Sequence, residues 1–147
     1  MVAMFGGIVD GKVFGGCEVK NHLQSGLTNA KETTVERILC HASQSSNFDS
    51  ALVKTQTVSN DNDGSSENWT LYGIFQISQH FCSGAGPLCG DGCERFVDDD
   101  IADDIECVEK IKDKFLKNPI GANQFLKEMI SRLVSPNFQI PCVTDCN

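Results

Sequence analysis

Apolar residues recur at intervals of three and four in the first part of the chain, a spacing that lines one face of an α-helix. A first helix is predicted near residues 17–25, with Gly26 as the residue that ends it. In a second helix, Thr33 and Glu36 have the spacing of a capping box, in which side chains bond the first free N–H groups. The apolar face of this second helix contains Val35, Ile38, Leu39 and Ala42.

Two more helices are predicted in the second half of the chain. The apolar face of the third contains Ile101, Ile105, Val108, Ile111 and Phe115. The fourth follows Pro119, and its face contains Leu126, Met129, Ile130 and Leu133. Between the second and third helices, residues 60–66 are rich in turn formers and residues 70–78 in strand formers. Helices on both sides of a small sheet predict an α+β fold.

The length and charge of the chain limit what it binds. A chain of 147 residues is expected to form one domain with its own core. The net charge of −8 argues against nucleic acid, which needs a basic surface. No apolar run is long enough to span a bilayer. Residues 1–11 are expected to be a disordered tail or the remnant of a leader, and residues 12–147 a single domain that acts as a monomer.

The cysteines indicate a secreted, disulfide-bonded protein. Eight cysteines are spread over the chain without any Cys-x-x-Cys pair, which favours four disulfides in an oxidising compartment over a zinc site. They are Cys17, Cys40, Cys82, Cys89, Cys93, Cys107, Cys142 and Cys146. Asn68-Trp69-Thr70 is a glycosylation sequon, with Asn68 as the acceptor of the glycan, and it is compatible with secretion.

An acidic cluster lies between Cys93 and Cys107. Five aspartates fall within seven residues, and like charges so close together repel unless something compensates them. These are Asp98, Asp99, Asp100, Asp103 and Asp104. One or two of them would be enough to cap a helix and favour its positive end. Because five exceed that need, we predict a hard cation with oxygen ligands.

Short motifs along the chain carry a resemblance to a known family. They are residues 12–18 (KVFGGCE), 26–27 (GL), 38–40 (ILC), 46–48 (SNF), 63–65 (DGS) and 72–78 (YGIFQIS). In this order, and with the matching order of cysteines, they resemble C-type lysozyme and α-lactalbumin. The resemblance implies a lysozyme-like fold of two lobes, a helical lobe and a small antiparallel sheet, with a cleft between them and four disulfides.

The resemblance also implies how the cysteines pair. The pairs are Cys17–Cys146, Cys40–Cys142, Cys82–Cys93 and Cys89–Cys107. The second of these departs from the family, because only three residues separate the last two cysteines here. Either the chain after Leu133 reaches Cys40 by another route, or this pairing has changed.

The family's two catalytic positions are occupied by residues that cannot do the chemistry. Retaining glycoside hydrolysis needs a carboxylic acid and an ionised carboxylate across the cleft. By the resemblance, these positions are Ser45 and Leu71 in this chain, and a serine hydroxyl is too weak an acid. An insertion before the 72–78 motif would bring Glu67 closer to the second position. Asp49 and Asp63 are more simply read as loop and turn residues.

The acidic cluster resembles the calcium loop of α-lactalbumin nearly residue for residue. By that resemblance, Asp98, Asp103 and Asp104 supply carboxylate oxygens to Ca²⁺. Arg95 and Asp100 supply backbone carbonyls, and Asp99 points to solvent. The expected role of the ion is to stabilise the fold.

Together these observations predict a secreted, non-catalytic, calcium-binding lysozyme-like protein. It is expected to bind peptidoglycan or chitin-type sugars in recognition or defence, without hydrolysis. The candidate cleft residues are Gln76, His80, Phe81 and Phe125. A module that binds a protein partner, as α-lactalbumin does, is the first alternative. A weak muramidase that uses Glu67 or Asp63 is the second.

Overall fold

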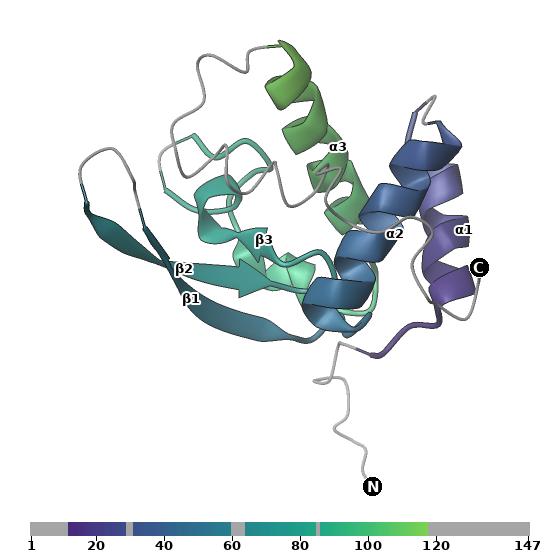
Figure 1. The fold of residues 1–147 in the computed structure, drawn as a ribbon, viewed down its shortest axis with the longest axis horizontal. Helices are drawn as coiled ribbons and strands as arrows, with labels where there is room; N and C mark the ends of the chain where they lie inside the picture. Colours follow the sequence, from purple (N-terminus) through teal and green to yellow (C-terminus); the bar gives the residue numbers. More distant parts are fainter. Residues whose placement is uncertain (1–11, 29–30, 60–63, 85, 118–147) are drawn as a thin grey trace, which may run out of the picture.

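The computed structural model describes residues 12–28, 31–59, 64–84 and 86–117, and these ranges contain three α-helices and a three-stranded sheet (Figure 1). In chain order the elements are α1 (Gly16–Gly26), α2 (Glu32–Ser46), β1 (Val53–Ser59), β2 (Ser66–Tyr72), β3 (Ile77–Ser78), the 3-10 helices η2 (Gln79–Phe81) and η3 (Cys93–Phe96), and α3 (Ala102–Lys117). None of the helices in these ranges has the length and apolar character of a membrane span.

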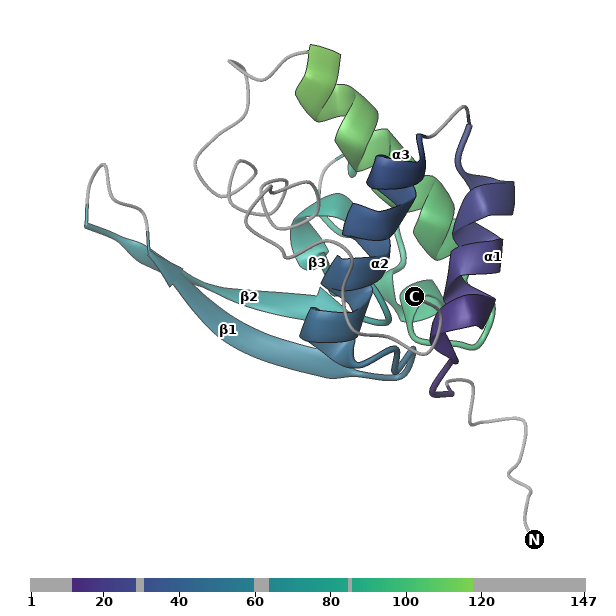
Figure 2. The ribbon, with the colours of Figure 1, turned by 45° about the vertical axis from the view of Figure 1, so that its right-hand side comes forward.

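The helices gather on one side of the molecule and the sheet extends from the other (Figures 1 and 2). Helix α1 contacts both α2 and α3. Strands β1 and β2 are antiparallel along their whole length, from the pair Val53–Tyr72 to the pair Ser59–Ser66. Strand β3 pairs only with the last two residues of β2. The predicted α+β arrangement, with the helices and the antiparallel sheet in separate parts of the fold, is confirmed.

The predicted apolar faces form the core between these parts. Val35, Ile38, Leu39 and Ala42 of α2 are all buried, as are Ile101, Ile105, Val108 and Ile111 in and before α3. The sheet side adds Trp69 and Phe75, and η3 adds Phe96. The side chain of Phe115 and the predicted fourth helix lie outside what the structure describes. Helical periodicity therefore identified the buried face of both α2 and α3.

The predicted capping box at the start of α2 is wrong. The helix begins at Glu32 after Lys31, which makes no capping hydrogen bond with its side chain, so Thr33 lies inside the first turn. Glu36 instead forms an ion pair with Lys20 of α1 at 3.0 Å, and Glu32 forms a second with the same ammonium group at 3.3 Å. The Glu36 carboxylate therefore links α2 to α1 and does not cap the start of α2.

Helix α1 ends at Gly26, as predicted. Leu27 follows it in extended conformation, so the helix ends without a left-handed glycine. A Cβ on Gly26 would lie 2.9 Å from Cγ2 of Ile105, which is closer than packed carbon atoms approach. The missing side chain therefore allows α1 to pack tightly against α3.

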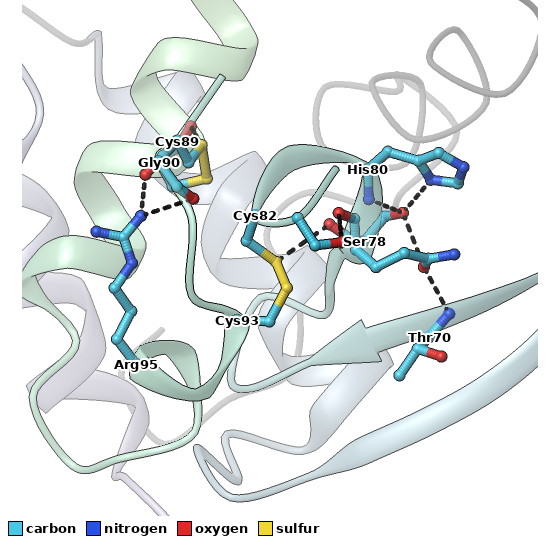
Figure 3. Close-up of a disulfide and its surroundings, with 11 residues drawn as sticks. Thr70, Ser78, His80, Cys82, Cys89, Gly90, Cys93 and Arg95 are labelled. Carbon is cyan, nitrogen blue, oxygen red and sulfur yellow. Dashed lines mark hydrogen bonds between the residues drawn. A yellow bond between two sulfur atoms is a disulfide. The ribbon is translucent and has the colours of Figure 1, made fainter. Parts of the chain in front are cut away.

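Two of the predicted disulfides are present among the described residues. Cys82 is bonded to Cys93, with Cα atoms 5.0 Å apart (Figure 3). Cys89 is bonded to Cys107, with Cα atoms 5.2 Å apart. Cys17 and Cys40 are disulfide-bonded as well. Their predicted partners, Cys142 and Cys146, lie outside the described residues. The two observed bridges hold the segment between the sheet and α3.

Candidate metal centre

Three aspartates of the acidic cluster converge on one point. One oxygen from each of Asp98, Asp103 and Asp104 can be chosen so that all three lie within 4.8 Å of one another. Asp103 and Asp104 lie in the first turn of α3, whereas Asp98 lies in the loop after η3. These are the three side chains that the sequence predicted as carboxylate ligands. They form the only such group of acidic, histidine or cysteine side chains found in the described part of the chain.

Local hydrogen bonds bend the loop so that Asp98 returns toward the helix. Oδ1 of Asp98 accepts from the N–H of Asp100 at 3.1 Å, and Oδ1 of Asp100 accepts from the N–H of Ala102 at 3.1 Å. Such aspartate turns replace backbone bonds that an extended chain would leave unmade. Asp99 is exposed, in agreement with its predicted solvent position. The loop thus separates the inward-facing aspartates from the outward-facing ones.

Asp104 is the most unusual member of the cluster. The residue is 0 % exposed, and neither carboxylate oxygen has a hydrogen-bond donor among the described residues. Burial, followed by the charges of Asp103 and Asp98, raises the pKa of Asp104 from 3.8 to about 9. Burial also raises the pKa of Asp98, against the lowering effect of the Asp100 N–H bond. An ionised Asp104 therefore needs a positive charge beside it.

The residues present fit a hard cation. The converging groups are all oxygens, and no soft ligand or histidine joins them in the described residues. Calcium accepts six to eight oxygens in flexible geometry, and carboxylates and backbone carbonyls are its usual protein ligands. The unpaired oxygens of Asp104 and Oδ1 of Asp103 are buried acceptors of the kind that such an ion would satisfy.

Arg95 anchors the segment that leads into the acidic loop. Its guanidinium donates hydrogen bonds to the carbonyls of Cys89 and Gly90, and it lies 4.8 Å from the centre of the Phe96 ring (Figure 3). The Cys89–Cys107 bridge joins the same loop to α3. The backbone of Arg95, predicted as a carbonyl ligand, is therefore fixed from two sides.

Ser45 and Leu71, the residues predicted at the family's two catalytic positions, have structural roles in the described part of the chain. The hydroxyl of Ser45 donates to the carbonyl of His41 at 2.5 Å, within its own helix. Leu71 is 4 % exposed and belongs to the core. Neither side chain offers an acidic proton or a negative charge to a substrate.

Glu67 forms a pair with His80 that the sequence did not predict. Oε1 of Glu67 lies 2.5 Å from Nε2 of His80, and Nδ1 of the same ring lies 2.5 Å from the Ser78 hydroxyl. The ring also packs edge-on against Trp69, with centroids 4.9 Å apart. A sequence separation of 13 residues gives no local signal for such a pair. It follows from the pairing of β2 with the chain around β3.

The predicted cleft residues divide into buried and accessible ones. Gln76 and Phe81 are each 2 % exposed, and the Gln76 carboxamide donates to the carbonyls of Leu52 and Gly73. The side chain of His80 is 28 % exposed to solvent. Phe125 lies outside the described residues. Among the described candidates, His80 is the one whose side chain is partly exposed.

Asn68, the predicted acceptor of a glycan, lies on the exposed side of β2. Asn68 is exposed, and its Oδ1 accepts a hydrogen bond from the hydroxyl of Thr57 on β1 at 3.0 Å. The bonded group is the carbonyl oxygen, so the amide nitrogen, where a glycan would attach, is not the atom that Thr57 holds. The position is compatible with the sequon prediction.

Comparison with known proteins identifies the family. The model of the C-type lysozyme/alpha-lactalbumin family matches residues 12–132. The chain belongs to this family. Similar relatives include α-lactalbumin of Tachyglossus aculeatus aculeatus, 36 % identical over 110 residues that cover 68 % of this chain and 79 % of that one. A putative lysozyme C-2 of Rattus norvegicus is 34 % identical over 110 residues, which cover 70 % of this chain and 69 % of that one.

Solved structures agree with the family fold. A lysozyme from Litopenaeus vannamei has a TM-score of 0.58 at 24 % identity, with 85 % of this chain and 87 % of that chain covered. Canine milk lysozyme in its holo form has a TM-score of 0.51 at 25 % identity, with 76 % and 92 % covered. The relatives of the chain thus include both α-lactalbumins and lysozymes.

Proposed function

We propose that the protein is a secreted, calcium-binding member of the family that lacks the catalytic carboxylates. The observation that carries the calcium part is Asp104, a fully buried carboxyl group without a hydrogen-bond donor in the described residues, beside two further aspartates. A buried charge of this kind is unfavourable unless it is protonated or paired. A divalent cation would pair it and would also offset the repulsion within the cluster.

Calcium suits this group better than magnesium does. Magnesium demands near-ideal octahedral geometry and keeps several waters. Calcium accepts irregular oxygen sets at longer distances and loses its waters more readily. In the proposed site, Asp98, Asp103 and Asp104 supply carboxylates, and the carbonyls of Arg95 and Asp100 complete the protein ligands. The ion would neutralise the loop and join it to α3.

Calcium titration of a matched pair of variants tests the site. Asp104→Asn removes the buried charge, whereas Asp99→Asn removes an exposed charge from the same loop. With calcium at about a thousand times its Kd, we expect wild-type protein to gain about 4 kcal/mol of stability. That gain corresponds to a rise in Tm of roughly 10 °C for a chain of this size. Asp99→Asn should retain the gain and Asp104→Asn should lose it.

One further measurement separates loss of the ion from loss of the fold. In the presence of chelator, Asp104→Asn should melt at or above the wild-type temperature, because a neutral amide replaces a buried carboxyl group that is unfavourable when ionised. Calorimetric titration that shows no calcium binding to well-washed wild-type protein would contradict the proposed site.

We propose that the protein does not hydrolyse sugars, because Ser45 and Leu71 stand where the family resemblance places the two carboxylates. Ser45 holds a helix carbonyl and Leu71 is a core residue, so the general acid and the second carboxylate are both missing there. Loss of these groups removes turnover without removing every contact that a sugar could make. We therefore propose binding of peptidoglycan or chitin-type sugars, with a role in recognition or defence.

Retention on insoluble polymers tests the sugar proposal. Wild-type protein should be retained on peptidoglycan or chitin and released by soluble N-acetylated oligosaccharide. His80→Ala should weaken retention, because His80 is the accessible candidate in the described residues. Thr57→Ala, an exposed change on the sheet, is the control. A protein partner in place of a sugar predicts no retention on either polymer and no competition by oligosaccharide.

The Glu67–His80 pair favours a weak hydrolase as the second candidate function. The side chain of Glu67 is 39 % exposed, and its carboxyl group lies 2.5 Å from Nε2 of His80, a nitrogen that can carry a proton. Such a pair could exchange a proton with a bound substrate. Clearing of a cell-wall suspension by the wild-type protein that disappears in Glu67→Gln would support this candidate. No clearing by either protein would reject it.

A further inference from the structure

The turn between β2 and β3 lies directly against the acidic cluster. Gly73 has a φ of +76°, and a Cβ built on it would lie 1.8 Å from the carbonyl oxygen of Phe96. The same Cβ would lie 3.3 Å from Oδ2 of Asp104. Any side chain at this position would occupy space beside the buried carboxylate. Glycine therefore allows the sheet to close over one side of the cluster.

Helix α2 holds this turn from the other side. The hydroxyl of Ser46 lies 2.6 Å from the carbonyl oxygen of Ile74, to which it can donate, and 2.9 Å from that of Ala42 in its own helix. Nε2 of His41 lies 2.7 Å from the carbonyl oxygen of Phe75, so this nitrogen carries the proton. Both donors are buried, where a hydrogen bond is costly to lose.

Gln76 fixes the turn in a conformation that few side chains adopt. Its φ is 52°, in the left-handed region, and its carboxamide donates to the carbonyls of Gly73 at 2.9 Å and Leu52 at 3.1 Å. The N–H of Gly73 donates to the same Leu52 carbonyl at 2.8 Å. A strained residue persists where its surroundings over-determine it. The turn is therefore a rigid piece rather than a loose connection.

From these contacts we propose that the 73–76 turn is a wall of the calcium site, and that Ser46 and His41 of α2 position it. The inference rests on the calcium binding proposed above and extends it to residues that do not touch the ion. Because α2 holds the turn and the turn closes on Asp104, calcium affinity depends on hydrogen bonds made on the far side of the turn. By linkage, the bound ion favours the arrangement in which these bonds are formed.

Two neighbouring serines provide a matched test. Ser46→Ala removes a donor to the turn, whereas Ser45→Ala removes a hydroxyl that bonds only its own helix in the described residues. We expect Ser46→Ala to weaken calcium binding about tenfold, the effect of one buried hydrogen bond, and Ser45→Ala to change it less than about twofold. The measurement is calcium titration by calorimetry at a temperature where both variants are folded.

A spectroscopic signature separates positioning from general destabilisation. Tb³⁺ is bound in place of calcium, and its luminescence lifetimes in H₂O and D₂O give the number of coordinated waters. If Ser46→Ala lets the turn move away, additional water should reach the ion in that variant and not in Ser45→Ala. Gly73→Ala, which would place a methyl group 1.8 Å from the Phe96 carbonyl oxygen, should also abolish ion binding, and its unfolding in chelator measures how far the fold itself is affected.

The possible outcomes keep the two proposals distinct. Weaker binding and extra water in Ser46→Ala alone would support the wall. Wild-type affinity and hydration in Ser46→Ala would overturn it while leaving the calcium site in place. Equal weakening in both serine variants would also overturn it, because the cause would then be α2 itself. Absence of binding to the wild-type protein would reject the calcium proposal first.

Discussion

At the scale of single residues, Asp104 connects the fold to the proposed ion. Its side chain is fully buried between the start of α3 and the β2–β3 turn, and Asp103 and Asp98 face the same point. A sequence of five aspartates indicated that a cation was needed, but it did not show which carboxylate is buried. That distinction comes from the glycine at position 73, which lies 31 residues earlier in the chain and permits the close approach.

The shifted pKa of Asp104 predicts how stability changes with pH in ion-free protein. The pKa of Asp104 is about 9 in the folded chain, against 3.8 for an unperturbed aspartate. Between these values the folded state binds more protons than the unfolded state, so the free energy of unfolding falls as pH rises. This contribution is fully present below the unfolded pKa and is lost as pH rises toward the folded pKa.

Urea unfolding in chelator at about pH 5 and about pH 8 measures this effect. Wild-type protein should be less stable at the higher pH, and Asp104→Asn should lose most of that difference. With calcium present the trend should reverse for the wild type, because binding requires the ionised carboxylate. A chelated wild type whose stability rises between these pH values would contradict the burial of a protonated Asp104.

At the scale of elements, the short strand β3 is extended by a side chain. Oε1 of Gln79 accepts from the N–H of Thr70 at 2.7 Å, and its Nε2 donates to the carbonyl of Asn68 at 3.3 Å. The carboxamide therefore bonds β2 where a longer β3 would have placed a peptide group. This arrangement explains how two residues of β3 are enough to hold β2 on that side.

Removal of the Gln79 carboxamide should loosen this part of β2. In Gln79→Ala, the N–H of Thr70 loses its partner, and its hydrogen exchange should accelerate by about tenfold, as expected for one lost hydrogen bond. Thr57→Ala removes an exposed bond on the opposite edge of β2 and should leave the Thr70 amide unchanged. Equal exchange in all three proteins would show that the carboxamide does not protect the strand.

The elements show where sequence patterns are informative and where they are not. Helical periodicity identified the buried residues of α2 and α3, because the spacing of apolar residues is contained in the segment's own sequence. Strand β1 was not predicted, although residues 53–58 are rich in Val and Thr, because its pairing with β2 is non-local. The prediction of a capping box was wrong for a related reason, since Glu36 forms an ion pair with Lys20 on another helix.

At the scale of the whole molecule, the segment from Cys82 to Cys107 connects the sheet to α3. Cys82–Cys93 joins the residue after η2 to η3 (Figure 3), and Cys89–Cys107 joins the loop before η3 to α3. The family resemblance predicted both pairings and which three aspartates of the segment converge. It could not predict the Glu67–His80 pair or the Gly73 contact, because these depend on how β2 and its turn pack against distant residues.

The Cys89–Cys107 bridge should therefore matter for both stability and ion binding. It closes a loop of 18 residues, for which chain-entropy arguments give about 3 kcal/mol of stabilisation. Since the loop contains Asp98, Asp103 and Asp104, a freer loop should also pay more entropy when an ion gathers these side chains. Replacing both cysteines by alanine should lower the unfolding free energy by about 3 kcal/mol in chelator and weaken calcium binding.

Denaturant unfolding in chelator and calorimetric calcium titration measure the two effects separately. Asp99→Asn, which leaves the bridge intact and changes only an exposed residue of the loop, provides the reference for both measurements. If the variant lacking the bridge lost stability but bound calcium as tightly as the wild type, the loop would be ordered by its own aspartate turns. The expected weakening would instead show that the disulfide arranges the carboxylates before an ion arrives, because covalent restraint reduces the conformational freedom that binding must remove.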